Sequence, residues 1–167
     1  VAAPNVVTVA ADVFAYEPTV FDALTYAGRF RPDVVIDYAT LTGAVLIALG
    51  DECAALFTAD DSVASDLLAA GETTGERLWR LPLWDDYREN LRSDWADMKN
   101  TAGRAAGTIN AAVFLKEFVP AGVPWAHLDV AGVAHFEKEH AGYSAGATGF
   151  GVALTMEFLK RRFEKRR

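Results

Sequence analysis

Acidic and imidazole side chains recur at alternate positions of one extended segment. His127 and Asp129 alternate with Leu128 and Val130, so both would project from the same face of a strand at 125–130. Such a pair suits metal binding or acid/base chemistry, because histidine titrates near neutrality and a carboxylate can orient the imidazole. It equally suits a hydrogen-bonded structural pair, and the spacing alone leaves both interpretations open.

A polar turn follows the apolar run Val34–Ile36 and offers a second place for chemistry. The segment Asp37–Gly43 reads DYATLTG, and the apolar residues Ala44–Leu49 come directly after it. Val34–Ile36 is typical of a buried strand that the turn Thr40–Gly43 brings to an end. Open α/β sheets bind ligands at the carboxyl ends of their strands. We therefore expect a binding site at this turn.

A third group of polar side chains lies near the C-terminus. His135, Glu137, Glu139 and His140 include imidazole and carboxylate groups that can bind a metal ion. Their irregular spacing and loop-like setting favour a solvated surface instead. This segment is therefore not predicted to be a metal site.

Two further features are interpreted as structural. Gly146–Gly151 offers backbone donors at the start of a helix, where anions bind, but it lacks the lysine and the spacing of a phosphate-binding loop. We interpret it as a tight turn that packs a helix. Cys53 is the single cysteine of the chain and lies in an apolar segment, which is more typical of core packing than of a nucleophile.

The elements that must position these side chains alternate between strand and helix. Apolar patterning predicts strands at 6–9, 34–38, 54–57 and 125–130, with helices beginning near Pro18, at 62–70, at 84–91, at 109–118 and after Gly151. The helix at 62–70 is expected to end near Gly71. The last helix is expected to bury the stripe Val152, Met156, Leu159 and Phe163. This order predicts one α/β domain over 1–167, with a mixed, mostly parallel sheet covered by helices on both faces.

Composition and charge limit the partners and the compartment. The formal net charge is −7, and because 160–167 holds six basic residues and one acidic residue, residues 1–159 carry −12. That acidic part argues against a nucleic-acid surface, and the basic end is left as the place that could contact phosphates or anionic lipid. We interpret the basic end as cations that oppose the dipole of a final helix. The longest apolar run, Ala44–Leu49, is far too short to span a membrane. With a lone cysteine and no signal peptide, we expect a cytoplasmic protein that binds neither nucleic acid nor membranes.

Several motifs in order resemble the leucyl aminopeptidase (cytosol aminopeptidase, M17) family. Besides the turn at 37–44, they are Glu76–Leu83 (ERLWRLPL), Ala96–Asn100 (ADMKN), Trp125–Gly132 (WAHLDVAG) and Ala147–Gly149 (ATG). Together they extend over roughly residues 5–162. The resemblance implies the C-terminal part of that family's catalytic domain. It also favours a structural role for His127 and Asp129, because the family's metal ligands lie elsewhere.

The family's metal-binding signature is replaced in this chain. The signature N-T-D-A-E-G-R precedes a helix that matches Asp22–Ala27, and counting back without a gap places its two carboxylate positions on Val13 and Ala15 and its arginine on Glu17. Neither valine nor alanine can ligate a divalent cation. Further family ligands precede the signature, and this chain begins only ten residues before it. We therefore expect neither catalytic nor metal-binding residues here.

What the resemblance retains is the substrate cradle. In the family, the A-T-L-T-G turn contacts the N-terminal residue of the bound peptide, which implies substrate binding by Thr40, Leu41 and Gly43, and the turn Ala131–Ala134 resembles another wall of that pocket. The sequence thus predicts an aminopeptidase-like domain that is inactive in isolation and needs no cofactor. It is expected to self-associate as a homo-oligomeric scaffold and to contact peptide N-termini.

The alternative is a metal-dependent aminopeptidase that removes apolar N-terminal residues. It requires Mn²⁺ or Zn²⁺, held either by a new site or by a complementing chain. The candidate ligands of a new site are Asp12, Glu17, Asp37, His127 and Asp129.

Overall fold

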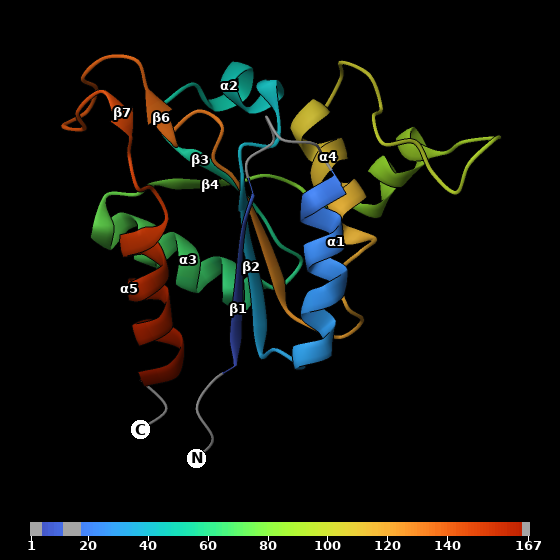
Figure 1. The fold of residues 1–167 in the computed structure, drawn as a ribbon, viewed down its shortest axis with the longest axis horizontal. Helices are drawn as coiled ribbons and strands as arrows, with labels where there is room; N and C mark the ends of the chain where they lie inside the picture. Colours follow the sequence, from blue (N-terminus) through green and yellow to red (C-terminus); the bar gives the residue numbers. More distant parts are fainter. Residues whose placement is uncertain (1–4, 12–17, 165–167) are drawn as a thin grey trace.

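A five-stranded mixed sheet in the order β1-β2-β5-β3-β4 divides the molecule (Figure 1). The computed structural model describes residues 5–11 and 18–164. The strands are β1 (Val6–Ala11), β2 (Val34–Ala39), β3 (Ala54–Phe57), β4 (Leu78–Arg80) and β5 (Trp125–Asp129). β1, β2 and β5 run parallel, β3 is antiparallel to β5, and β4 is parallel to β3. This confirms the mixed, mostly parallel sheet.

Helices cover both faces of this sheet, as predicted. α1 (Pro18–Ala27) and α4 (Gly107–Lys116) lie on one face, and α3 (Asp61–Thr74) and α5 (Val152–Phe163) on the other (Figure 1). The short helix α2 (Gly43–Leu49) lies at the carboxyl end of β2, next to the hairpin formed by β6 (His135–Phe136) and β7 (Gly146–Ala147). Two 3₁₀ helices, η2 (Gly28–Phe30) and η3 (Asp85–Leu91), complete the described elements.

The two faces of the sheet bury different kinds of side chains. On the α3/α5 face, alternate strand residues such as Ile36 and Leu56 join Leu67 and Phe158 in an apolar cluster. On the α1/α4 face, apolar residues share the strands with the buried polar side chains of Asp37, His127 and Asp129. Successive strand residues point to opposite faces. His127 and Asp129 of β5 therefore face α1 and α4, whereas Leu128 between them joins the apolar cluster on the other face.

The helix α3 is longer than predicted. It continues to Thr74 and ends at Gly75, whose left-handed conformation (φ 77°) suits glycine. Gly71, expected to end the helix, is buried within it. A Cβ atom at Gly71 would lie only 2.8 Å from the carbonyl oxygen of Glu76. Glycine is required there by a close backbone approach rather than by the helix terminus.

The buried stripe of α5 also differs from the prediction. Of the predicted stripe, Leu159 and Phe163 are partly buried against the core, whereas Val152 and Met156 are 69% and 54% exposed. Leu154 and Phe158 are the fully buried residues of the helix. The helix is rotated so that positions four residues apart on its other side face α3. The first turn is held by Glu76, whose carboxylate accepts a hydrogen bond of 2.6 Å from the backbone N–H of Leu154.

The segment near Trp84, the turn at Gly151 and the position of Cys53 refine the expected elements. The segment predicted as a short helix near Trp84 is the 3₁₀ helix η3. Gly151, in the turn predicted to pack a helix, lies so close to the ring of Tyr38 that a Cβ atom would be 2.6 Å from it. Cys53 is half-buried and precedes β3 rather than lying in the core. Within the described ranges, no helix combines the length and apolar character needed to cross a bilayer.

Candidate functional site

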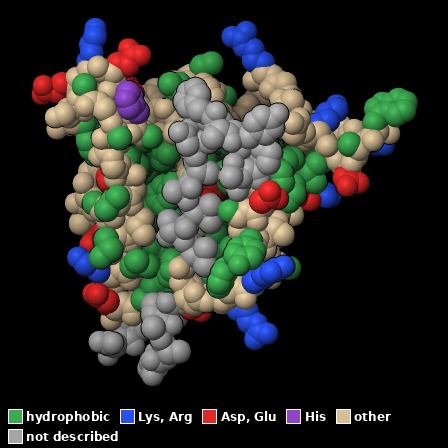
Figure 2. All heavy atoms as spheres, in the orientation of Figure 1, with side chains coloured by type: hydrophobic (Ala, Val, Ile, Leu, Met, Phe, Trp, Pro, Cys, Tyr) green, Lys and Arg blue, Asp and Glu red, His purple; other side chains and the backbone are tan. Residues whose placement is uncertain are grey.

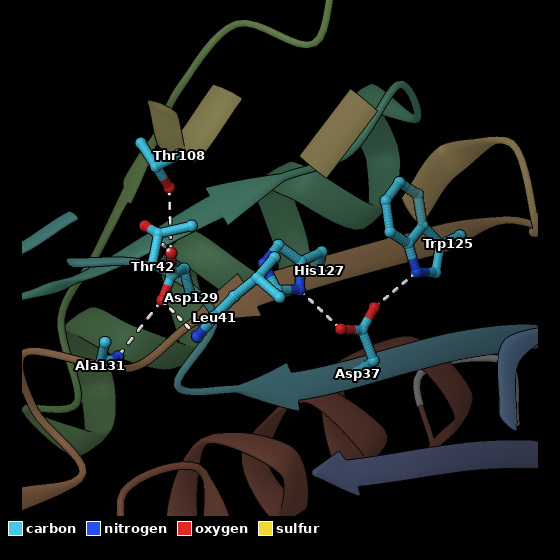
Figure 3. Close-up of polar contacts among 8 residues, drawn as sticks. All are labelled: Asp37, Leu41, Thr42, Thr108, Trp125, His127, Asp129 and Ala131. Atoms are coloured by element: carbon cyan, nitrogen blue, oxygen red, sulfur yellow. Dashed lines mark hydrogen bonds and ion pairs between the residues drawn. The ribbon is translucent and has the colours of Figure 1, made fainter. Parts of the chain in front are cut away.

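The polar side chains predicted on β2 and β5 lie close together near the carboxyl ends of these two strands. The two strands pair in parallel, with Asp37 opposite His127 and Ala39 opposite Asp129. Asp37, His127 and Asp129 are each fully buried on the sheet face that α1 and α4 cover. Figure 3 shows that they form two separate hydrogen-bonded groups, one within the sheet and one at its end.

Asp37 is the acceptor of the first group. Its carboxylate accepts hydrogen bonds of 2.6 Å from the indole Nε1 of Trp125 and 2.6 Å from Nδ1 of His127 (Figure 3). Burial disfavours a charged imidazole, but the charge of Asp37, its hydrogen bond and the nearby charge of Asp129 outweigh burial, so the pKa of His127 is raised. The predicted pairing of His127 with Asp129 is therefore wrong, because the imidazole is hydrogen-bonded to Asp37 of the adjacent strand instead.

Asp129 is the acceptor of the second group, and it fixes the predicted binding turn. Its Oδ1 accepts from the backbone N–H groups of Leu41 (3.1 Å) and Ala131 (3.3 Å). Its Oδ2 accepts from the hydroxyl groups of Thr42 (2.7 Å) and Thr108 (3.0 Å). One buried carboxylate therefore joins the turn after β2, the turn after β5 and the start of α4 (Figure 3).

The turn itself leads directly into α2. Thr42 is the N-cap residue, and its hydroxyl oxygen accepts a hydrogen bond of 3.2 Å from the backbone N–H of Val45 while donating to Asp129. Gly43 is the first residue of the helix, and a Cβ atom placed there would meet no atom within 4 Å. The space beside Gly43 is therefore open.

A cavity of about 180 Å³ borders this turn. Leu41 and Thr42 contribute to its wall together with Ala44 of α2. The opposite wall is formed by α4, the preceding loop and η3: Leu91, Asn100, Thr101, Ala102, Gly103, Gly107, Asn110, Ala111, Phe114 and Leu115. Most of the lining side chains are apolar, and the polar ones are those of Thr42, Asn100, Thr101 and Asn110. Of the three predicted binding residues, Leu41 lines this cavity, whereas Thr40 and Gly43 flank the lining segment.

Two candidate metal ligands among the described residues, Asp37 and Asp129, are already engaged by hydrogen bonds within the protein. Both oxygens of Asp37 and both oxygens of Asp129 already accept hydrogen bonds from protein donors. Nε2 of His127 has no hydrogen-bond partner among the described residues, but it is a single buried ligand atom. The positions Val13 and Ala15, and the candidate ligands Asp12 and Glu17, lie outside the described residues.

Two members of the site were not anticipated from the sequence. Trp125 shares the strand face of His127, and its period-two spacing could have indicated a contact with the same carboxylate. Thr108 contacts Asp129 from the first turn of α4, far away in sequence. Nothing in the local pattern around Thr108 indicates that contact.

The C-terminal histidines lie apart from this site. His135, Glu137 and Glu139 are exposed, which agrees with the predicted solvated surface. His140 is half-buried instead, and it faces Asp51 and Glu52 of the turn between α2 and β3.

The sequence is similar to cytosol aminopeptidases. A family model described as the catalytic domain of the cytosol aminopeptidase family matches residues 19–156. A Syntrophotalea carbinolica protein named "Probable cytosol aminopeptidase" is 57% identical over 140 residues, which cover 84% of this chain and 28% of that protein. A Synechococcus protein of the same name is 52% identical over 141 residues, covering 84% and 29%. The chain therefore spans less than a third of the length of these curated relatives.

Solved structures share the fold as well. The bottromycin maturation enzyme BotP superposes with a TM-score of 0.81 at 48% identity, covering 85% of this chain and 32% of that one. BotP has also been solved in complex with Mn, with a TM-score of 0.81 at 47% identity. A mutant tomato leucine aminopeptidase has a TM-score of 0.80 at 42% identity, covering 86% and 28%.

Proposed function

The chain belongs to the cytosol aminopeptidase family, and from this membership we propose that it forms the peptide-cradle part of such a catalytic domain without hydrolysing peptides by itself. The observation that carries the proposal is the turn Thr40–Gly43, which Asp129 fixes through Leu41 and Thr42 beside a mostly apolar cavity. A turn held by a buried carboxylate is preorganised, so a ligand does not have to order it.

The proposed ligand is the N-terminal end of a peptide with an apolar first residue. The cavity is lined largely by apolar side chains, including Leu41, Leu91 and Phe114, and apolar pockets with few polar groups are typical of small-ligand sites. We expect leucine amide to shift the backbone amide resonances of Leu41 and Gly43 in a heteronuclear NMR titration. Unchanged resonances at saturating leucine amide would contradict the proposed cradle.

The proposed lack of hydrolysis rests on the replaced signature. Aminopeptidases of this kind need metal ions to generate hydroxide at neutral pH, and Val13 and Ala15 provide no ligand atoms at the family's positions. Leucine p-nitroanilide should therefore be hydrolysed only at the background rate by the purified chain in Mn²⁺ or Zn²⁺. Metal-dependent turnover that a chelator abolishes and added metal restores would show that this part of the proposal is wrong.

A second candidate is a working aminopeptidase completed by a separate chain. The chain covers only 28% of a curated relative, and a Mn complex of BotP is among its structural neighbours. Mixing this chain with a polypeptide that carries the remaining part of the family's catalytic domain tests this candidate. Turnover of leucine p-nitroanilide in the mixture alone would favour it over the inactive cradle.

We also propose that the chain self-associates. Several large apolar side chains are exposed, with Trp95 at 97%, Ile47 at 82% and Trp84 at 64%, and Figure 2 shows hydrophobic side chains scattered between charged groups over one face. Exposed apolar surface favours association. Sedimentation velocity should detect a dimer or larger species at micromolar concentration, whereas a monomer would contradict the proposal.

A further inference from the structure

A second cluster of ligand-type side chains lies apart from the cradle. Asp51, Glu52 and His140 each offer one ligand atom, and these atoms all lie within 4.8 Å of one another. Nε2 of His140 is 3.6 Å from Oε1 of Glu52 and 3.9 Å from Oδ2 of Asp51. These distances are too long for hydrogen bonds. They are slightly longer than the ~3.4 Å between two atoms bound tetrahedrally to one cation through bonds of about 2.0–2.2 Å, so binding requires a small rotation of the exposed carboxylate side chains.

The imidazole nitrogen is the atom that points to a ligand. Nε2 of His140 is buried and has no hydrogen-bond partner among the residues that the structure describes, although 31% of the whole side chain is exposed. A buried polar atom without a partner is unfavourable. A cation between this nitrogen and the two carboxylates would satisfy all three groups together.

His140 is held in place by its own hairpin. Its backbone N–H donates to the carbonyl oxygen of Tyr143 (3.1 Å), and the N–H of Tyr143 donates back (2.8 Å). Its ring packs on Phe136 of β6, with ring centroids 4.7 Å apart. Ligands whose orientation is fixed by surrounding packing lose little freedom when an ion binds.

The two carboxylates belong to a segment that packs against the chain leading to this hairpin. Asp51 and Glu52 follow Gly50, the residue that ends α2. Gly132, just after β5, approaches Gly50 so closely that a Cβ atom would lie 2.1 Å from the Gly50 carbonyl oxygen. Figure 1 shows the β6–β7 hairpin beside α2 at the same end of the sheet. The two halves of the cluster are thus positioned by segments already in contact.

We propose that Asp51, Glu52 and His140 bind one divalent transition-metal cation, best matched by Zn²⁺, which clamps the β6–β7 hairpin to the turn between α2 and β3. One imidazole and two carboxylates suit Zn²⁺, whereas Mg²⁺ and Ca²⁺ prefer oxygen ligands alone. Water completes the coordination. Because α2 begins at the turn Thr40–Gly43, the clamp connects the helix that leaves the proposed cradle to the β6–β7 hairpin.

Calorimetric titration of the chelator-treated chain with ZnCl₂, repeated with CoCl₂ under absorption spectroscopy, tests the site without any activity assay. We expect saturable binding, visible Co²⁺ bands and a Tm that rises with Zn²⁺. The variant His140→Gln should weaken binding roughly tenfold or more. The matched control is His135→Gln, which removes an exposed histidine of the same hairpin and should bind as the original chain does.

A second variant keeps the test decisive if His140→Gln perturbs folding. The side chain of Glu52 is 68% exposed, so Glu52→Gln should preserve the circular dichroism spectrum while weakening Zn²⁺ binding. No saturable Zn²⁺ binding by the original chain would overturn the proposal and leave an ion pair between His140 and the carboxylates. Equal binding by the original chain, His140→Gln and Glu52→Gln would also overturn it, because the ion would then be held elsewhere.

Discussion

Asp37 and Asp129 make the most instructive comparison in this molecule. Both carboxylates are fully buried, both face α1 and α4, and they come from neighbouring parallel strands. Within the described residues, Asp37 accepts from side chains of β5, those of Trp125 and His127. Asp129 accepts from two backbone N–H groups and two threonine hydroxyls. One aspartate holds the sheet together internally, whereas the other attaches three segments to the sheet's end.

This difference means that Asp37 contributes to the stability of the sheet, whereas Asp129 also positions the turn Thr40–Gly43. A buried carboxylate is tolerated only when its lone pairs are satisfied, and both residues meet that requirement. The donors around Asp37 lie within the sheet and do not reach the predicted cradle. The donors around Asp129 include the cradle's own backbone, at Leu41. Changes at Asp37 should therefore affect unfolding, whereas changes around Asp129 should also affect the turn.

The largest expected effect is that of Asp37→Ala. The substitution leaves the indole N–H of Trp125 and Nδ1 of His127 buried without a partner. Breaking a buried pair by removing one partner costs about 3–5 kcal/mol. Urea denaturation followed by circular dichroism should show a decrease of that size in the free energy of unfolding.

A matched exposed aspartate provides the control for this experiment. The side chain of Asp61 is 91% exposed and pairs with Arg80 at 2.8 Å. Exposed ion pairs contribute little, so Asp61→Ala should leave the free energy of unfolding nearly unchanged. If Asp37→Ala were as mild as Asp61→Ala, the group around Asp37 would not be a stabilising one.

An intermediate effect is expected from Thr42→Ala, on the Asp129 side of the comparison. The substitution removes the cap of α2 and one donor to Asp129, but three donors to that carboxylate remain. We expect a loss of about 2 kcal/mol in the free energy of unfolding. The backbone amides of Leu41 and Val45 should also exchange faster in hydrogen-exchange NMR.

Thr42→Ser is the matched variant, because serine retains the hydroxyl that both accepts and donates. It should protect the Leu41 amide as well as threonine does. Equally fast exchange in both variants would mean that the methyl group, not the hydrogen bonds to Asp129 and Val45, holds the turn.

The fold was largely predictable from apolar patterning, whereas its corrections came from contacts between distant segments. Val34–Ile36 predicted its strand because buried parallel strands are nearly continuous in apolar residues, and 125–130 predicted its strand because apolar residues alternate with His127 and Asp129. The predicted buried face of α5 was wrong at Val152 and Met156, which fit helical spacing as well as Leu154 and Phe158 do, and right at Leu159 and Phe163. Only packing against α3 decides between these two faces.

The hydrogen-bond partners of the buried polar groups were even less predictable from the sequence. Alternation placed His127 and Asp129 on one face correctly, but alternation along one strand cannot reveal which residue of the adjacent strand is the partner. The register of β2 against β5 brings Asp37 opposite His127. Contact between Asp129 and Thr108 depends in turn on where α4 docks. Such pairings require the three-dimensional arrangement.

The smallest expected effect is a pH dependence of the free energy of unfolding that comes from the pair formed by Asp37 and His127. The pKa of His127 is raised above its usual value despite burial, because the charges of Asp37 and Asp129 and the hydrogen bond to Asp37 favour the imidazolium. The folded chain therefore retains a proton that the unfolded chain loses near pH 6.5. Its stabilising contribution is complete below about pH 6.5 and is lost as the pH rises through the folded pKa, with a slope of at most about 1.4 kcal/mol per pH unit.

Urea denaturation at several pH values from 5 to 9 measures this slope, and NMR titration of the imidazole identifies the group. Asp37→Asn removes the charge while keeping a side chain of similar shape, so its free energy of unfolding should depend less on pH than that of the original chain. The remaining dependence in the variant reports groups other than the pair formed by Asp37 and His127. A difference between the two chains that grows with pH would contradict the assignment, because a proton held by Asp37 and His127 stabilises the folded chain most at low pH.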